Sequence, residues 1–197
     1  MSLRLAITID TEHPDRPADP ANPERLFAAL DRLDVRATVF MEGRWAGARP
    51  EFAHSIADAG HLIGNHSMWH TPMVLLDDAG VKRSVTSAAE AIERATGADP
   101  RPWFRCPFGE GQDDPRVLGL LEQLGYREIR WEVDSNDWSP GRDPEAMTER
   151  VVAEALARGD GARLLFHSWP DPTAEAVEAI VPRLRAQGAE LVRLDAL

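Results

Sequence analysis

Two histidines separated by three residues, His66 and His70 in the segment GNHSMWH, have a spacing that suits a metal site. Residues four apart on a helical turn present their side chains on one side, where a single cation can reach both imidazole rings. Two nitrogen ligands rarely suffice for a metal in a protein. The pair therefore indicates either a metal site with a third ligand from elsewhere, or two hydrogen-bonded rings in a loop.

Asp10 and Glu12, in the segment ITIDTEHPD, are the candidates for the third ligand. A site of two histidines needs one carboxylate, so the second carboxylate is left to act as a base beside an open metal position. His167 is a candidate for the acid. Such a set would hydrolyse an amide or ester, because the metal polarises the carbonyl, the base activates water and an imidazolium protonates the leaving group.

The elements that must position these residues follow from the pattern of apolar residues. Short runs rich in Val, Ile, Leu and Phe predict seven strands, and segments of helical period between them predict six helices. The strands are expected at 3–9, 36–41, 61–65, 103–106, 127–133, 163–167 and 190–194, and the helices at 23–33, 49–59, 77–96, 115–124, 143–158 and 173–187. Alternating strands and helices predict parallel strands, hence an α/β barrel or an open doubly wound sheet.

Polar residues stand where these strands end: Asp10, His66, Arg105, Asp134 with Asp137, and His167. In a barrel of parallel strands the carboxyl ends converge on one face, where binding and catalytic groups lie. An open sheet would gather the same residues along one edge. Both folds predict that these polar residues form one site.

The composition is typical of a globular protein and argues against several kinds of partner. The chain has 197 residues, 43% hydrophobic and 28% charged, which fits one globular domain over 1–197. A formal net charge of -11 argues against nucleic acid or an anionic membrane as partner. The segment MSLRLAITID is typical of a strand rather than a leader, and no apolar stretch reaches membrane-spanning length, so we expect a cytoplasmic protein, the alternative being a secreted protein whose leader has been removed. The single Cys106 excludes an intrachain disulfide and is expected to be buried packing.

Five short motifs resemble those of a known family, the polysaccharide deacetylases of carbohydrate esterase family 4, or NodB-homology domain. TIDTE stands where the family has Thr-Phe-Asp-Asp, HSMWH resembles His-Ser/Thr-x-x-His, and RCPFG resembles Arg-x-Pro-Tyr/Phe-Gly. DSNDW resembles Asp-x-x-Asp-Trp, and LLFH resembles Leu-x-His. The motifs occur in the family's order, so the resemblance implies a single-domain distorted (β/α)7 barrel and a metal-dependent deacetylase of an N-acetylated carbohydrate.

The resemblance also implies a role for each matching residue. Asp10 would be the general base and His167 the general acid. Arg105 would pair with Asp10, and Asp137 would favour the imidazolium form of His167, as a nearby opposite charge should. Glu12, His66 and His70 would bind the metal, with zinc the first choice and cobalt, nickel or manganese as substitutes. The backbone N–H of Phe108 would stabilise the oxyanion, while Trp138 and Leu165 would wall the acetyl methyl group.

The first motif departs from the family's commonest pattern, because Glu12 replaces an aspartate and comes one residue later. We expect its longer side chain to reach the same coordination point, with His13 as the substitute ligand. Two other functions compete with the deacetylase: an amidohydrolase of a small non-sugar amide, as in the allantoinase-like relatives, and a catalytically silent sugar-binding module. Trp45 and Trp169, expected in loops, are either core residues or surfaces for stacking a sugar ring. The sequence is silent on oligomeric state.

Overall fold

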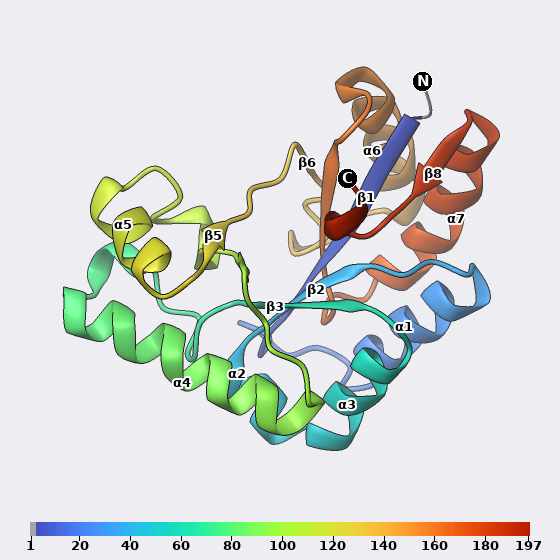
Figure 1. Cartoon of the computed structure of the whole chain (residues 1–197). Coiled ribbons are helices and arrows are strands. Elements are labelled where there is room, and N and C mark those ends of the chain that lie inside the picture. Colours follow the sequence, from blue (N-terminus) through green and yellow to red (C-terminus); the bar gives the residue numbers. More distant parts are fainter. Residues whose placement is uncertain (1–2) are drawn as a thin grey trace. The chain divides into compact units, whose positions relative to one another are not determined.

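The computed structural model describes residues 3–197, which form two compact units (Figure 1). Unit 1 comprises residues up to 10, 14–38 and 131–197, and unit 2 comprises 11–13 and 39–130. The first strand, β1 (Leu3–Thr11), therefore contributes its last residue to unit 2. The single domain expected over 1–197 stays a prediction.

Unit 1 is a small parallel sheet with helices. Its strands stand in the order β8 (Ala189–Leu191), β1, β7 (Arg163–His167), β6 (Val133–Asp134), and each adjacent pair is parallel. The helices are α1 (Asn22–Arg32), α6 (Pro144–Arg158) and α7 (Thr173–Ala186), with a final 3-10 turn at Leu194–Ala196. Helix α7 packs against both α1 and α6. The register of β1 and β7 places Asp10 opposite His167 at the carboxyl ends of the two strands.

Unit 2 repeats this alternation of strands and helices. Its strands stand in the order β2 (Thr38–Met41, of which Thr38 belongs to unit 1), β3 (Leu62–Asn65), β4 (Trp103–Phe104), β5 (Arg127–Glu128). The helices are α2 (Gly43–Ala48), α3 (Pro50–Asp58), α4 (Asp78–Thr96) and α5 (Pro115–Gln123), with 3-10 turns at Met73–Leu75 and Pro107–Gly109. Both α2 and α3 pack on α4. Unit 2 thus contains residues 11–13 at the end of β1 and the loops after β3 and β4.

Local signals explain where several helices begin and end. The Asp77 carboxylate accepts the Gly80 N–H at the start of α4, and the Asp143 carboxylate accepts two N–H groups at the start of α6. Both satisfy backbone donors that a helix start leaves free. Helix α4 ends at Gly97, whose φ of 74° suits glycine.

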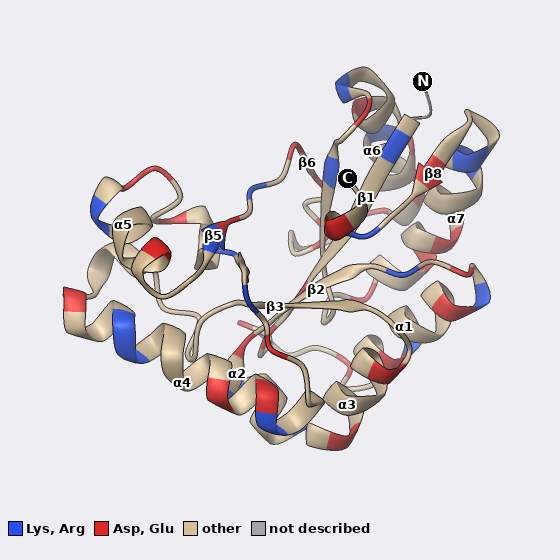
Figure 2. Cartoon of the chain, in the orientation of Figure 1, with Lys and Arg blue, Asp and Glu red and all other residues tan. Residues whose placement is uncertain are grey.

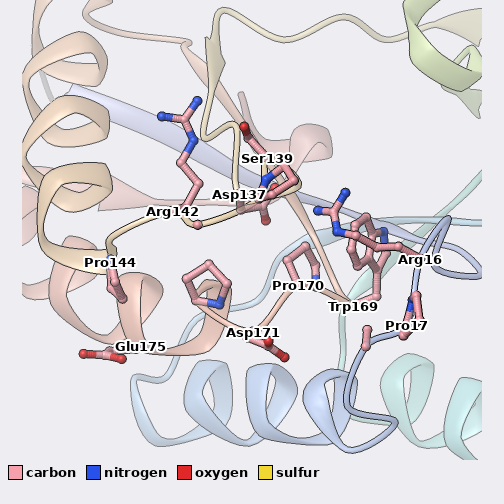
Figure 3. A pocket seen from close by; sticks show the side chains of 14 residues that line it. Arg16, Pro17, Asp137, Ser139, Arg142, Pro144, Trp169, Pro170, Asp171 and Glu175 are labelled. Atoms are coloured by element: carbon pink, nitrogen blue, oxygen red, sulfur yellow. The ribbon is translucent and has the colours of Figure 1, made fainter.

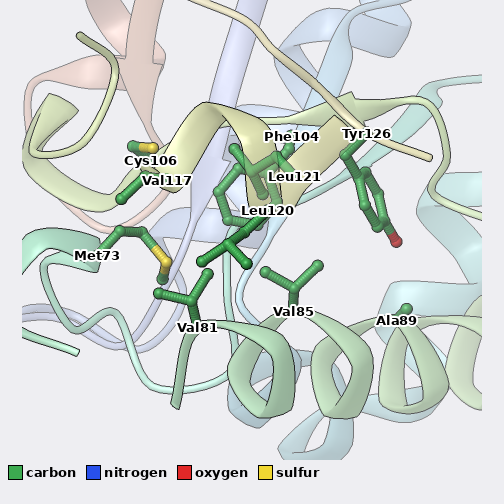
Figure 4. Packing of buried hydrophobic residues seen from close by; sticks show 10 residues of the cluster. All are labelled: Met73, Val81, Val85, Ala89, Phe104, Cys106, Val117, Leu120, Leu121 and Tyr126. Carbon is green, nitrogen blue, oxygen red and sulfur yellow. The ribbon is translucent and has the colours of Figure 1, made fainter. Parts of the chain in front are cut away.

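One hydrophobic cluster of unit 2 packs α4 against α5 and includes Phe104 of β4 (Figure 4). Ten buried side chains form this cluster: Met73, Val81, Val85, Ala89, Phe104, Cys106, Val117, Leu120, Leu121 and Tyr126. Cys106 is fully buried among them, which confirms the prediction that it packs. Burial raises the pKa of its thiol far above the usual range, with Glu128 acting in the same direction. The thiol is thereby kept protonated and inert.

Charged residues lie mainly on helices and loops rather than on the central strands. Figure 2 shows both signs of charge along α4, whereas β2 and β3 carry none. Within residues 3–197, every helix is too short or too polar to cross a membrane.

The α/β class with parallel strands is confirmed, and six predicted helices match observed ones closely. Two expectations were wrong. The strand expected at 127–133 is two short strands, because Arg127–Glu128 pair with β4 whereas Val133–Asp134 pair with β7. The loop expected around Trp45 is helix α2. The strand prediction failed because the two halves of the segment pair with different strands that are distant in sequence. The loop prediction failed because a helix only six residues long shows no clear helical period of apolar residues.

Candidate functional site

Glu12, His66 and His70 come together in unit 2 as a cluster that could hold a metal ion. One ligand atom from each residue lies within 4.8 Å of the other two. The Glu12 Oε2 atom is 2.6 Å from His70 Nε2 and 3.5 Å from His66 Nε2. Glu12 and His66 are buried and His70 is half-buried, so the cluster faces limited solvent. Two imidazole nitrogens and one carboxylate oxygen are a donor set that zinc accepts, with one coordination position left open.

His66 is oriented as a metal ligand by its other ring nitrogen. Its Nδ1 lies 2.9 Å from the carbonyl oxygen of Arg105. A carbonyl only accepts hydrogen bonds, so Nδ1 carries the proton and Nε2, which faces Glu12, is left with its lone pair. This is the arrangement that metal-binding histidines show, and it fixes both the tautomer and the ring direction. The residues therefore fit a divalent metal.

The loop that carries the two histidines is held in a sparsely populated backbone conformation. Ser67 and His70 have positive φ values of 67° and 52°. The Asn65 side chain accepts the Ser67 N–H, and the Ser67 hydroxyl accepts the His70 N–H at 3.1 Å. Such strain persists only where surrounding contacts over-determine it, and it concentrates at functional sites. The serine of the HSMWH motif thus steadies the loop.

Arg105 is fully buried in unit 2 and its contacts there are structural as well as electrostatic. Its Nε donates to the Ile129 carbonyl at 3.1 Å, and its guanidinium carbon lies 4.2 Å from the centroid of the Phe40 ring. Burial raises the pKa of the nearby Glu128 carboxyl, and the Arg105 charge opposes that rise. Glu128 was missed by the sequence analysis, because it stands inside an expected strand. The predicted pairing of Arg105 with Asp10 stays a prediction.

In unit 1 the expected acid, His167, is bound to Asp137 by two hydrogen bonds. The Asp137 carboxylate accepts the His167 backbone N–H and its Nδ1–H, both at 2.8 Å. The Thr173 hydroxyl donates to the same carboxylate at 2.7 Å. Asp137 thereby orients the His167 ring, with a proton on Nδ1. Thr173 is the first residue of α7, and the sequence analysis did not single it out.

The remaining expected residues of unit 1 lie on β1, β6 and β7 and in the loop after β6. Asp10 is buried, and it stands opposite His167 in the β1–β7 register. Leu165 is also buried, two residues before His167, so strand alternation places both on the same face. Burial raises the pKa of Asp134, partly offset by a hydrogen bond from the Asn136 N–H. Trp138 is 43% exposed.

Two exposed aromatic side chains, Phe108 and Trp69, lie against or next to His70 of the metal cluster. Phe108 is 61% exposed, has a positive φ of 57°, and its ring centroid lies 4.3 Å from that of His70. Trp69, next to His70, is 58% exposed. Trp45 and Trp169 are both buried, so they are core residues rather than stacking surfaces.

A cavity of about 450 Å³ opens in unit 1 against Asp137 (Figure 3). Its lining includes Arg142, Arg16 and Pro170, and the Arg16 guanidinium carbon lies 4.6 Å from the centroid of the Trp169 ring. The lining mixes positive, negative and proline side chains. This composition suits a polar, hydrogen-bonding ligand better than an apolar one.

His13, the substitute ligand, lies outside the metal cluster. Its Nδ1 is 2.8 Å from the Glu42 carboxylate, which also accepts the His13 backbone N–H. Among the described residues 3–197, the cluster of metal-binding type contains Glu12 rather than His13.

The fold and site define a class of α/β proteins with a histidine–carboxylate metal cluster and an aspartate-bound histidine. The polysaccharide deacetylase family model matches residues 4–129, which is more than half of the chain. The chain belongs to the polysaccharide deacetylase family. This match includes the first three motifs and ends before Asp134 and His167.

Two curated relatives extend the similarity beyond residue 129. The chain is 32% identical over 168 residues to the uncharacterized protein YlxY of Bacillus subtilis, covering 85% of this chain and 50% of YlxY. It is 27% identical over 197 residues to a Bacillus cereus peptidoglycan-N-acetylglucosamine deacetylase, covering 98% of this chain and 67% of the relative. The chain thus spans only half the length of YlxY.

A solved structure confirms the fold that the resemblance implied. The Bacillus anthracis protein BA3943, named as a pseudoenzyme of carbohydrate esterase family 4, matches with a TM-score of 0.87 and 28% identity. The match covers 98% of this chain and 64% of BA3943. A similar fold and sequence therefore occur in a protein named a pseudoenzyme, so function has to be argued from the site residues and not from the fold.

Proposed function

We propose that this chain is a metal-dependent deacetylase that hydrolyses the acetamide of an N-acetylated sugar in a glycan. The observation that carries the proposal is the cluster of Glu12, His66 and His70, with His66 Nδ1 bound to the Arg105 carbonyl. The B. cereus relative, named a peptidoglycan-N-acetylglucosamine deacetylase, supports the substrate class. Zinc is the proposed metal because two imidazoles and a carboxylate suit it, with cobalt, nickel or manganese as substitutes.

In this proposal, Asp10 removes a proton from water as the water oxygen forms a bond to the acetamide carbon. His167 then donates its Nε2 proton to the amide nitrogen while the carbon–nitrogen bond breaks, so the products are acetate and a free amino sugar. Asp137 holds the His167 ring and stabilises its protonated form. A divalent metal bound by Glu12, His66 and His70 would supply Lewis acidity toward the carbonyl oxygen.

The acetyl group itself would be recognised by the residues carried over from the family. The Phe108 backbone N–H is proposed to bind the developing oxyanion, as a donor aimed at new negative charge. Trp138 and Leu165 are proposed as the apolar walls around the methyl group. Leu165 is buried and follows the alternation that puts it on the face of His167, which supports its part in that wall.

The test is acetate release from chitooligosaccharides and from peptidoglycan by protein stripped of metal and reloaded with zinc. We expect turnover with zinc, loss of turnover after chelation, and none in the Asp10→Asn variant, whose side chain cannot accept the proton. Zinc-loaded wild type that releases no acetate from any glycan would refute the proposal. Turnover of small non-sugar amides instead would indicate the allantoinase-like function, and saturable binding without turnover would indicate a silent sugar-binding module.

A further inference from the structure

Glu42, which links β2 to α2, and the first two residues of α2 are hydrogen-bonded to both segments that supply the metal ligands. We name Glu42, Gly43 and Arg44 the strap. The Glu42 N–H donates to the Thr11 carbonyl at 2.8 Å, immediately before Glu12. The Gly43 N–H donates to the Ser67 carbonyl at 2.9 Å, immediately after His66, and the Arg44 N–H donates to Met68 at 3.2 Å. None of the five sequence motifs includes the strap.

The Glu42 side chain adds a second hold on the loop of Glu12. Its Oε2 accepts the His13 backbone N–H and the His13 Nδ1–H, both at 2.8 Å. Together with the bond from the Glu42 N–H to Thr11, these contacts fix the residues on both sides of Glu12. Glu42 therefore brackets the one carboxylate of the metal cluster without touching it through any of these bonds.

The burial of Glu42 indicates that this hold has a purpose other than packing. The side chain is 0% exposed, and burying a carboxylate costs free energy unless its oxygens are satisfied. Glu42 precedes α2 at the N-cap position, yet its side chain makes no capping hydrogen bond there. Its Oε2 instead binds His13, while its Oε1 makes no hydrogen bond within residues 3–197 and lies 3.1 Å from the Arg44 Nε as an ion pair. An apolar residue would fill the same space at less cost.

Arg44 links Glu42 to the second loop, which contains His66 and His70. Its guanidinium carbon lies 5.8 Å from the centroid of the Trp69 ring, a cation–π distance, and Trp69 directly precedes His70. Gly43 permits the close approach of the strap to its neighbours, because a Cβ there would lie 2.7 Å from the Ala88 Cα and from the Met68 Sδ. One buried carboxylate thus reaches the neighbours of Glu12 and of His70.

We infer that Glu42 is a positioning residue that holds Glu12 and the histidine loop in the geometry that binds metal. The inference rests on the proposed metal-dependent function and deepens it, since it assigns metal retention to a residue outside the family motifs. Partners of metal ligands typically change metal affinity 10- to 100-fold when removed. Removal of Glu42 is therefore expected to act on affinity through the loop of Glu12.

The test compares Glu42→Ala and Glu42→Gln with a matched control, Glu132→Ala. Glu132 lies in unit 1 and likewise accepts a backbone N–H, that of Arg163 at 2.8 Å, and pairs with the Arg163 guanidinium. Zinc affinity is measured by competition with a chromophoric chelator. We expect affinity to fall about 10- to 100-fold in Glu42→Ala and less in Glu42→Gln, whose amide oxygen still accepts the His13 N–H. Glu132→Ala should bind zinc as wild type does.

A second readout uses the metal-free protein, so it is independent of whether the wild type binds zinc. Hydrogen exchange of peptides covering 11–14 should become faster in Glu42→Ala and stay unchanged in Glu132→Ala, with circular dichroism showing that both variants are folded. If wild type binds no zinc, the proposed function fails, while faster exchange still supports the hold of Glu42 on the loop. A folded Glu42→Ala variant with unchanged exchange, or with the zinc affinity of a zinc-binding wild type, overturns the inference.

Discussion

The assignment of Glu12 as the anionic metal ligand predicts a clear contrast between two neighbouring substitutions. Glu12→Ala removes one of three ligand atoms and the only carboxylate in the cluster, leaving His66 and His70. Asp10→Ala leaves all three ligands in place. We therefore expect the first substitution to weaken metal binding and the second to abolish turnover with the metal still bound.

The size of the effect follows from what each group contacts. A residue that merely supports a ligand is worth 10- to 100-fold in metal affinity, so loss of a ligand itself should exceed about 100-fold, or about 2.7 kcal/mol. The Glu12 Oε2 atom lies 2.6 Å from His70 Nε2, close enough for one ion to contact both groups. For Asp10→Ala, a loss of less than about tenfold is expected, since Asp10 is outside the cluster.

Calorimetric titration of zinc into wild type and both variants measures these affinities, and acetate release in excess zinc measures recovery. Excess zinc should restore part of the activity of Glu12→Ala, because the base and acid remain, and none of that of Asp10→Ala. Full-affinity zinc binding by Glu12→Ala would refute the assignment and show that another group is the third ligand.

Three further predictions test the supporting structure. Thr173→Val removes the 2.7 Å hydrogen bond to Asp137 and should lower kcat about tenfold with KM unchanged, measured by steady-state acetate release; an unchanged kcat would deny Thr173 a positioning role. Gly43→Ala places a Cβ 2.7 Å from the Ala88 Cα and should lower the unfolding free energy by about 1–3 kcal/mol in urea; wild-type stability would mean that the strap can shift. Burial raises the pKa of Asp134, so the folded state holds its proton more tightly and loses stability as pH rises through the range above 3.8; Asp134→Asn should therefore stabilise the protein at pH 7 and less at pH 4, and a gain that grows toward acid would contradict this.

The sequence by itself determined the class of fold and the residues of the metal cluster. Apolar periodicity and helix-start residues are local properties, so six helices and most strands were predicted near their observed positions. Parallel strands bring their carboxyl ends together, which is why Asp10 and Glu12 could be offered as partners of His66 and His70 although more than fifty residues separate them, and the family resemblance then selected Glu12. The departure of Glu12 from the family's commonest pattern could be recognised because the residue type and its spacing from Asp10 are visible in the sequence.

Only the tertiary structure decided how these ligands are held. His13, which donates two hydrogen bonds to Glu42, lies 29 residues away, and nothing in the local pattern of FMEGRW distinguishes a buried carboxylate from an exposed one. The Arg105 carbonyl that orients His66 is a backbone group, and backbone groups are the same at every position of a sequence. Strand β5 pairs with β4 and strand β6 with β7, so one apolar run became two strands. Hydrogen bonds between segments distant in the chain determine all three features, and a local pattern of residue types does not record which segments become neighbours.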